Sequence, residues 1–247
     1  MITIKSAKEI ERMRLAGRIT AGARSAARKA LRPGITTEEI NTVVHEFILS
    51  QKAIPTFLGY GGFPKSACVS VNDEIIHGIP GKRIIEDGDI VSVDVGATFK
   101  RYVGDCAGTY PVGKASQEAL DLIAVTRGSF FEGIKYARAG NRLSDISHAV
   151  QEYVESRGYS VVREYVGHGI GTEMHEDPQV PNYGRPGHGP LLVPGMTLAI
   201  EPMVNAGKAD VRVLSNEWTV VTVDGSLSAH YENTILITDG EPEILTY

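Results

Sequence analysis

Residues 90–96, Ile-Val-Ser-Val-Asp-Val-Gly, decide how the rest of the chain can be interpreted. Apolar and polar residues alternate along this segment, which predicts a β-strand with one buried face. Asp105 follows eleven residues after Asp94, so a hairpin would place two acids on neighbouring strands. Aspartate is disfavoured within strands, and a buried carboxylate needs a compensating partner. Taken alone, Asp94 could face solvent and Asp105 could cap a turn.

This strand has a second copy near the end of the chain. Residues 84–94 match residues 191–201 at a shift of 107, and the alignment places Glu201 at the position of Asp94. Two carboxylates at equivalent strand positions would point toward a common axis from opposite sides. The repeat therefore favours a functional role for Asp94 over a surface position.

Two further matches connect the halves of the chain. Residues 32–40 match residues 138–146 at a shift of 106, and the helices that follow keep the same register of apolar positions. The tripeptide His-Gly-Ile at 77–79 is repeated at 168–170. Residues 176–190 are rich in proline and glycine, and we expect them to form an inserted surface loop without regular structure. These matches predict two copies of a helix-helix-sheet unit, related by a pseudo-twofold axis.

Capping residues followed by apolar residues at helical spacing predict four helices. They begin near Ser6, Thr36, Ser116 and Ser144. Between them lie alternating segments typical of strands, so we expect an α+β fold. The chain is interpreted as one catalytic domain over residues 1–247, with halves of about 1–112 and 113–247.

Composition excludes several classes of protein. The net charge is −5, and no dense block of Lys or Arg indicates capture of nucleic acid or of an anionic membrane. The two cysteines, Cys68 and Cys106, form no CxxC pair, which argues against a disulfide framework or a cysteine zinc site. No signal peptide or membrane span is recognisable, so we expect a cytoplasmic protein.

Four carboxylates and one imidazole are candidates for a metal site. Acids gathered in one interior would repel one another and would be costly to bury. Two divalent ions held by bridging carboxylates would neutralise this charge and lower the pKa of a shared water. Oxygen ligands with one imidazole suit Mn, Fe or Co and tolerate Zn. The candidates are Asp94, Asp105, His168, Glu201 and Glu232.

Several ordered motifs resemble the type I methionine aminopeptidases over essentially the whole chain. They are Gly167-His168-Gly169 with the later His175, the spacing of Asp94 and Asp105, Ile200-Glu201-Pro202, and residues 230–234, His-Tyr-Glu-Asn-Thr. The resemblance implies the pita-bread fold, in which two pseudo-symmetric halves form a central antiparallel sheet covered by helices. It also implies that Asp94 chelates one metal ion, that Asp105 and Glu232 bridge, and that His168 and Glu201 bind the other.

The same resemblance assigns three catalytic roles. His77 would meet the region of the scissile amide, and His175 would donate a hydrogen bond to the carbonyl oxygen as charge develops there. Glu201 would carry the proton during hydrolysis. The implied reaction removes the initiator methionine from a nascent protein whose second residue is small.

A methionine pocket is implied at Tyr60, Phe63, Cys68 and Trp218, since a thioether binds well against aromatic faces. Phe57 and Met174 stand where some family members carry Cys and Phe, which puts the shape of this pocket in doubt. A monovalent cation is a further candidate ligand, at the loop of Asn72 and at Ser228. The remaining histidines are interpreted as structural or surface residues: His45, His148, His188 and His230.

Two alternatives belong to other functional classes. One is another pita-bread hydrolase, such as an Xaa-Pro peptidase, although those relatives usually carry a large N-terminal domain and only about ninety residues precede Asp94 here. The other is a metal-free binding module on the same scaffold, although no ligand of the motif set is missing. Expected partners are the N-terminal methionine of nascent peptides and, as a candidate, the ribosome. We expect a monomer with no membrane or direct nucleic-acid contact.

Overall fold

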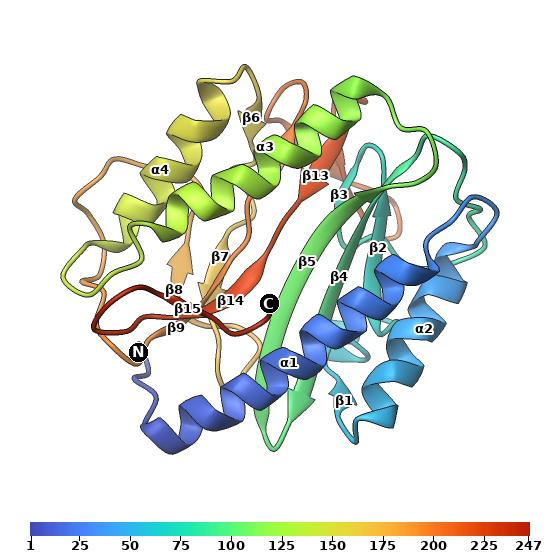
Figure 1. The fold of residues 1–247 in the computed structure, drawn as a ribbon. Coiled ribbons are helices and arrows are strands. Elements are labelled where there is room, and N and C mark those ends of the chain that lie inside the picture. The colour runs from blue at the N-terminus through green and yellow to red at the C-terminus, as the bar shows by residue number, and fades with distance from the viewer.

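Four helices and a set of antiparallel strands make up the computed structural model, which describes all residues 1–247 (Figure 1). The helices are α1 (Ala7–Ala30), α2 (Thr37–Ser50), α3 (Gln117–Ile134) and α4 (Leu143–Glu155). The strands are β1 (Ile54–Pro55), β2 (Ala67–Val71), β3 (Glu74–Ile76), β4 (Ile90–Phe99), β5 (Tyr102–Pro111), β6 (Ser160–Val161), β7 (Gly167–Gly169), β8 (Glu176–Val180), β9 (Thr197–Ile200), β10 (Met203–Asn205), β11 (Val211–Val213), β12 (Val220–Thr222), β13 (Ser228–His230), β14 (Asn233–Leu236) and β15 (Glu243–Ile244). The predicted helices and the α+β class are confirmed.

Two sheets dominate the strand layer. In the first, β4 pairs with β1, β2 and β5, and in the second the order is β15-β14-β9-β7-β8. Two three-stranded sheets, β13-β10-β6 and β11-β12-β3, complete the layer, and every ladder is antiparallel. The helices α1 and α3 cross the same face of these strands (Figure 1). No helix is long and apolar enough to cross a membrane.

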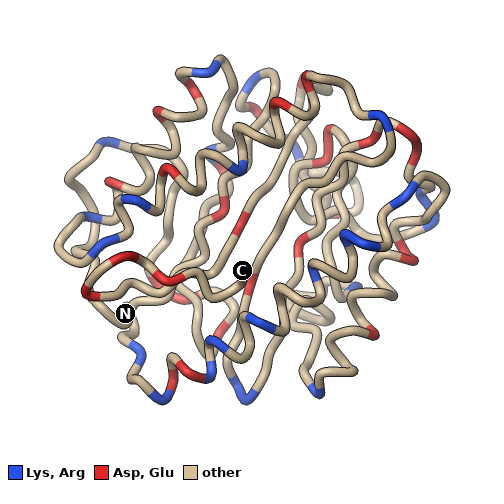
Figure 2. Tube along the Cα trace, viewed as in Figure 1, with Lys and Arg blue, Asp and Glu red and all other residues tan.

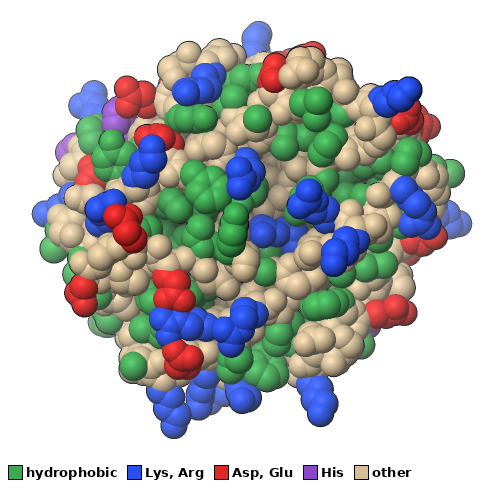
Figure 3. Space-filling model, in the orientation of Figure 1, with side chains coloured by type: hydrophobic (Ala, Val, Ile, Leu, Met, Phe, Trp, Pro, Cys, Tyr) green, Lys and Arg blue, Asp and Glu red, His purple; other side chains and the backbone are tan.

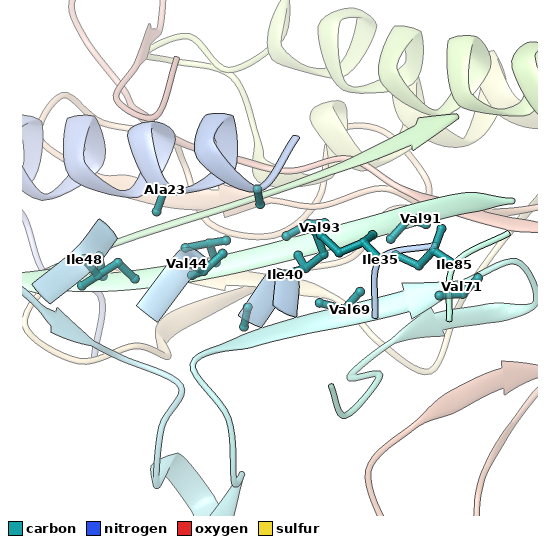
Figure 4. Packing of buried hydrophobic residues seen from close by; sticks show 14 of the residues in the cluster. Ala23, Ile35, Ile40, Val44, Ile48, Val69, Val71, Ile85, Val91 and Val93 are labelled. Carbon is teal, nitrogen blue, oxygen red and sulfur yellow. The ribbon is translucent and has the colours of Figure 1, made fainter. Parts of the chain in front are cut away.

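Successive side chains of β4 point to opposite faces of the strand. Val91, Val93 and Val95 belong to the core cluster beneath α1 and α2, so Asp94 points to the other face. On α2, side chains at helical spacing point at β2 and β4 (Figure 4). Each such aliphatic side chain, once fully buried, contributes roughly 1.5–3 kcal/mol of transfer free energy. The labelled residues of α2 are Ile40, Val44 and Ile48, all of them fully buried.

The backbone repeats the same hydrogen bonds in both halves. The amide of Gly34 donates to the carbonyl of Ile85 at 2.8 Å, and that of Gly140 donates to Leu192 at 3.0 Å. Both glycines adopt a left-handed φ, +90° and +92°, that other residues rarely adopt. Isolated bridges join Thr36 to Ile84 and Arg142 to Leu191 in the same way. These bonds support the proposed division of the chain into two copies.

A pseudo-symmetric seam joins β5 to the segment that carries Glu232. Ala107 and Glu232 exchange backbone hydrogen bonds of 3.2 and 3.1 Å. On one side of this pair the hydroxyl of Thr234 bonds to the amide and carbonyl of Asp105, at 3.0 and 2.9 Å. On the other side the hydroxyl of Thr109 bonds to the carbonyl and amide of His230, at 2.9 and 2.8 Å. The pseudo-twofold relation therefore places His230 at the position equivalent to Asp105.

Strand register corrects the alignment of the two His-Gly-Ile tripeptides. His168 lies opposite Ala199, whereas the residue opposite the equivalent Ser92 is Ser70. His168 therefore corresponds to Ser70, and its predicted match with His77 is wrong. The two tripeptides are identical in sequence but occupy different elements, because a three-residue identity carries no information about pairing.

The segment 176–190 is only partly the irregular loop that we expected. Its first residues form β8, which pairs with β7 at the edge of the five-stranded sheet. A proline removes a hydrogen-bond donor, and an edge strand tolerates this loss because one side pairs with no strand. Pro178 therefore fits within β8, and the prediction of no regular structure was wrong for residues 176–180.

Candidate metal centre

The hairpin β4–β5 holds the first two acids. Asp94 lies opposite Ala107, and Asp105 lies opposite Gly96 on the paired strand. Asp105 is buried and Asp94 half-buried, and the Oδ1 atom of each has no hydrogen-bond partner. Burial raises the pKa of both carboxyl groups, and the neighbouring Asp105 raises that of Asp94 further. Such a pair needs a cation to remain ionised.

The second half supplies an imidazole and two glutamates. The Nδ1 atom of His168 lies 2.9 Å from the carbonyl of Gly169, which assigns the ring proton to Nδ1 and leaves Nε2 free to coordinate. Nε2 lies 3.6 Å from Asp105 Oδ2 and 3.5 Å from Glu201 Oε1. Burial lowers the pKa of His168, which keeps the imidazole neutral, as a metal ligand must be.

The donor set fits a divalent cation. One ligand atom each from Asp105, His168 and Glu232 lie within 4.8 Å of one another, and all three residues are buried. The Oε1 atom of Glu232, like Oδ1 of Asp94, is buried without a hydrogen-bond partner. Buried carboxylate oxygens with no donor are costly, and a metal ion removes that cost. Figure 2 shows acidic positions on the central strands as well as on the outer helices.

All residues that the sequence singled out as divalent-metal ligands, catalytic groups or walls of the methionine pocket line one cavity of about 150 Å³. Phe57 and Met174, whose presence put the pocket shape in doubt, line it as well. Phe63 and Trp218 meet edge to face, with ring centroids 5.1 Å apart. The complete lining is Phe57, Tyr60, Phe63, Cys68, His77, Asp94, Asp105, His168, Met174, His175, Glu201, Trp218 and Glu232.

His77 and His175 flank the cavity. His77 adopts a left-handed φ of +58°, an uncommon conformation for a residue with a side chain, and its ring meets Trp218 edge to face at 6.4 Å. The His175 ring lies 4.3 Å from that of His168, and its Nδ1 atom bonds to the hydroxyl of Tyr60 at 2.7 Å. Loss of hydration lowers the pKa of both His77 and His175 to about 4, so both rings are neutral at neutral pH.

Sequence reasoning missed two residues near the cavity. Tyr165 packs edge to face against His77 at 5.9 Å. His230, which was interpreted as a structural or surface residue, is fully buried, and neither of its ring nitrogens has a hydrogen-bond partner. Its Nε2 atom lies 3.9 Å from Glu201 Oε2 and 3.8 Å from Glu232 Oε2. Its equivalence to Asp105 appears only in the strand pairing, so no sequence pattern indicated this position.

The remaining predicted positions have structural contacts. His45 and His148 are half-buried, and a ring nitrogen of each lies near a partner, Ser66 Oγ at 2.8 Å and the carbonyl of Gly184 at 3.2 Å. The amide of Ser228 donates to the carbonyl of Asn72 at 2.9 Å, so the two candidate residues for a monovalent cation are neighbours. The cation itself stays a proposal.

Comparison with known proteins agrees with this geometry. The model of metallopeptidase family M24 matches residues 11–239. The methionine aminopeptidase of Clostridium acetobutylicum is 60% identical over 247 residues, which cover 100% of this chain and 99% of that protein. The solved methionine aminopeptidase of Thermotoga maritima is 51% identical with a TM-score of 0.98, and the match covers 100% of this chain and 99% of that one.

More distant structures share only the fold. The prolidase of Pyrococcus furiosus superposes with a TM-score of 0.79 at 23% identity, over 99% of this chain but 65% of its own. The full-length matches at high identity, in contrast, are to methionine aminopeptidases. The chain therefore has the pita-bread fold and belongs to metallopeptidase family M24 and, within it, to the methionine aminopeptidases.

Proposed function

We propose that this methionine aminopeptidase removes the initiator methionine at the 150 Å³ cavity, from proteins whose second residue is small. The observation that carries the proposal is the convergence of acids, imidazoles and aromatic rings from both halves on one cavity. Two divalent ions, Co, Mn, Fe or Zn, would be held there. Their proposed ligands are Asp94, Asp105, His168, Glu201 and Glu232.

Divalent ions in this position would polarise the scissile carbonyl and lower the pKa of water. The protein's own groups position the substrate and move protons. Glu201 is proposed to accept a proton from the attacking water and to return it to the leaving amine. Its carboxylate lies beside His168, 3.5 Å from the ring, which supports a place next to the reacting groups.

The two flanking histidines are proposed as hydrogen-bond donors. Because their pKa values are about 4, each is neutral and carries one ring proton at neutral pH. Tyr60 can donate its hydroxyl proton to His175 Nδ1, which would leave the opposite nitrogen protonated and facing the cavity. That proton would stabilise negative charge on the carbonyl oxygen. His77 would contact the amide from the other side.

The methionine side chain is proposed to lie among the aromatic and sulfur-containing walls. Cys68 is buried, and Phe63 and Trp218 form a perpendicular pair at 5.1 Å. A thioether gains about 0.3–1.5 kcal/mol from contact with such rings. Met174 is flexible enough to fit closely around this side chain, and Phe57, which also lines the cavity, packs on Gly96, which has no side chain.

A peptide assay tests the proposal. The metal-stripped protein, loaded with Co, Mn or Fe, should release methionine from Met-Ala-Ser but not from Met-Lys-Ser. Preference for Xaa-Pro bonds, or no release with any of these metals, would contradict it. Asp94→Asn should lose metal binding and activity and keep most of its folding stability, because the carboxylate serves the metal. Asp239→Asn, an exposed acid outside the cavity, is the matched control.

A further inference from the structure

A second cavity, of about 480 Å³, lies between α1 and α3 on the face of the sheet opposite to the metal centre. Its floor includes Tyr110 and Tyr231, which alternate along their segments with the inward-pointing Asp105 and Glu232. The strand layer therefore lies between the two cavities, and His230, which lines the second cavity, also lies 3.8 Å from Glu232 at the metal centre. Figure 1 shows β5 and β13 passing between the two helices at this place.

Three arginines line this cavity, and each is held by a different part of the fold. Arg24 on α1 donates from Nη1 to the carbonyls of Ala107 and Glu232, at 3.0 and 3.2 Å, and thereby rests on the seam between the halves. The guanidinium of Arg28 lies 5.4 Å from the ring of Tyr110. Carbonyl acceptors fix the orientation of Arg24 without cancelling its charge.

Arg127 on α3 faces these two residues from the other wall. Its guanidinium lies 4.7 Å from the ring of Phe131 and 5.9 Å from that of Tyr231. Aromatic faces hold a guanidinium in place while its N–H groups remain free in the plane of the group. Arg28 and Arg127 are exposed side chains, and their contacts with aromatic rings restrict where their N–H donors point.

No side-chain carboxylate lines this cavity, although its lining also includes the last residue, Tyr247. None of the three arginines forms an ion pair, and no aspartate or glutamate lines the cavity. Figure 3 shows Lys and Arg side chains gathered near the centre of this face, with acidic side chains farther out. In a chain with a net charge of −5, this separation of charge indicates a site for an anion.

We propose that the cavity between α1 and α3 binds a small ligand with two phosphate groups. Guanidinium groups match phosphate oxygens in bidentate geometry. A phosphate monoester carries a charge of about −1.5 to −2, so two phosphate groups balance three arginines. The cavity volume falls within the range of about 300–1,000 Å³ that small-molecule sites occupy, which is ample for a diphosphate and its organic group. The phosphate chemistry is shared by pyrophosphate and by nucleoside diphosphates.

Calorimetric titration of the metal-loaded protein with pyrophosphate and with ADP tests this site. Arg28→Ala/Arg127→Ala should raise the dissociation constant for both probes by about tenfold or more, since each charge-assisted contact is worth that much. The matched control, Arg18→Ala/Lys29→Ala, removes two exposed positive charges from α1 that do not line the cavity, and should leave binding unchanged. Chelation of the catalytic metal by the probes is the same in every variant, so the difference between variants reports on this cavity alone.

Two outcomes would overturn the proposal: equal binding by both double variants and the parent, or displacement of the probes by sulfate at equal concentration. Loss of binding in the arginine variant alone supports it. In that case tighter binding of ADP identifies a nucleoside diphosphate as the ligand, whereas equal binding identifies the diphosphate group as all that is recognised. Unfolding midpoints of both double variants, measured in parallel, confirm that each is folded.

Discussion

The two halves of the molecule repeat the same helix starts and turns but deliver their ligands differently. The N-terminal half uses a regular hairpin, β4–β5, whose ten-residue strands are joined by Lys100 and Arg101 in left-handed conformations. In the C-terminal half the equivalent β9 and β14 have four residues each, and Glu201 and Glu232 lie just beyond their ends. The helix starts and turns are repeated in the two halves, whereas the strand lengths and connections differ.

Neither half therefore contains the whole proposed ligand set. The hairpin supplies two carboxylates, and the shorter strands supply two glutamates and an imidazole. Regular pairing fixes the first two side chains, whereas the seam at Ala107 and Glu232 fixes the others relative to them. Matched substitutions in the two halves test whether each half contributes equally.

The largest effect is expected from one proposed bridging ligand in each half. Asp105→Asn and Glu232→Gln should each lower kcat/KM by about a thousandfold or more, because several kcal/mol of charge stabilisation depend on the metal. Metal at a thousand times its dissociation constant should stabilise the parent protein by about 4 kcal/mol. The same metal concentration should not stabilise either variant. Peptide hydrolysis and thermal unfolding with and without metal measure both.

Glu217→Gln and Asp239→Asn, two exposed acids outside the cavity, serve as controls and should behave like the parent protein. If only one of the two bridging variants lost metal-dependent stabilisation, the shared role of the halves would be refuted.

Two equivalent core isoleucines test whether the two copies of the repeat are packed equally well. Ile40 on α2 and Ile146 on α4 occupy equivalent positions and are 0% and 1% exposed. Ile40→Ala and Ile146→Ala should each cost about 2–5 kcal/mol, with similar values because each leaves a similar cavity. Denaturant unfolding of the metal-free variants gives both numbers. A cost at Ile146 below half of that at Ile40 would mean that the second copy packs more loosely.

The smallest effect is expected at the two helix starts, where the halves differ by one side chain. The hydroxyl of Thr36 accepts a hydrogen bond from the amide of Glu39 at 3.2 Å, and no such bond forms at Arg142. Thr36→Ala should therefore cost about 1 kcal/mol, and Arg142→Ala less than about 0.5 kcal/mol. Denaturation midpoints resolve this difference, and equal costs would show that the hydroxyl contributes nothing.

Much of the fold followed from patterns that are local in sequence. Alternation identified β4, capping residues identified α1, α2 and α3, and the shift of about 107 residues paired Asp94 with Glu201. Ser144, the expected capping residue of α4, lies inside that helix, whose N-cap is Arg142. The ligand set then followed from repulsion among acids and from the family resemblance. The structure gathers all of these side chains around one cavity, and no sequence pattern states how close they come.

What the sequence could not show depends on pairing between distant strands. The place of His230 beside Glu201 and Glu232 becomes visible only when β5 lies beside β14, because the equivalence with Asp105 runs through the threonine bonds of the seam. For the same reason the identical tripeptides at 77–79 and 168–170 were wrongly aligned. The second cavity could not be predicted either, since its arginines lie on two helices and the rings of Tyr110 and Tyr231 that they contact lie on other elements.

The seam between Ala107 and Glu232 also bears on when the protein becomes active during its synthesis. Its partners are far apart along the chain, and contacts of such long separation form late because closing the intervening loop costs entropy. The N-terminal helices and the β4–β5 hairpin can form as soon as they are made. Glu232, and Thr234, whose hydroxyl bonds to the backbone of Asp105, are translated much later. With Glu232 as a proposed metal ligand, we expect a nascent copy of this enzyme to gain activity only after residues 232–234 have been translated.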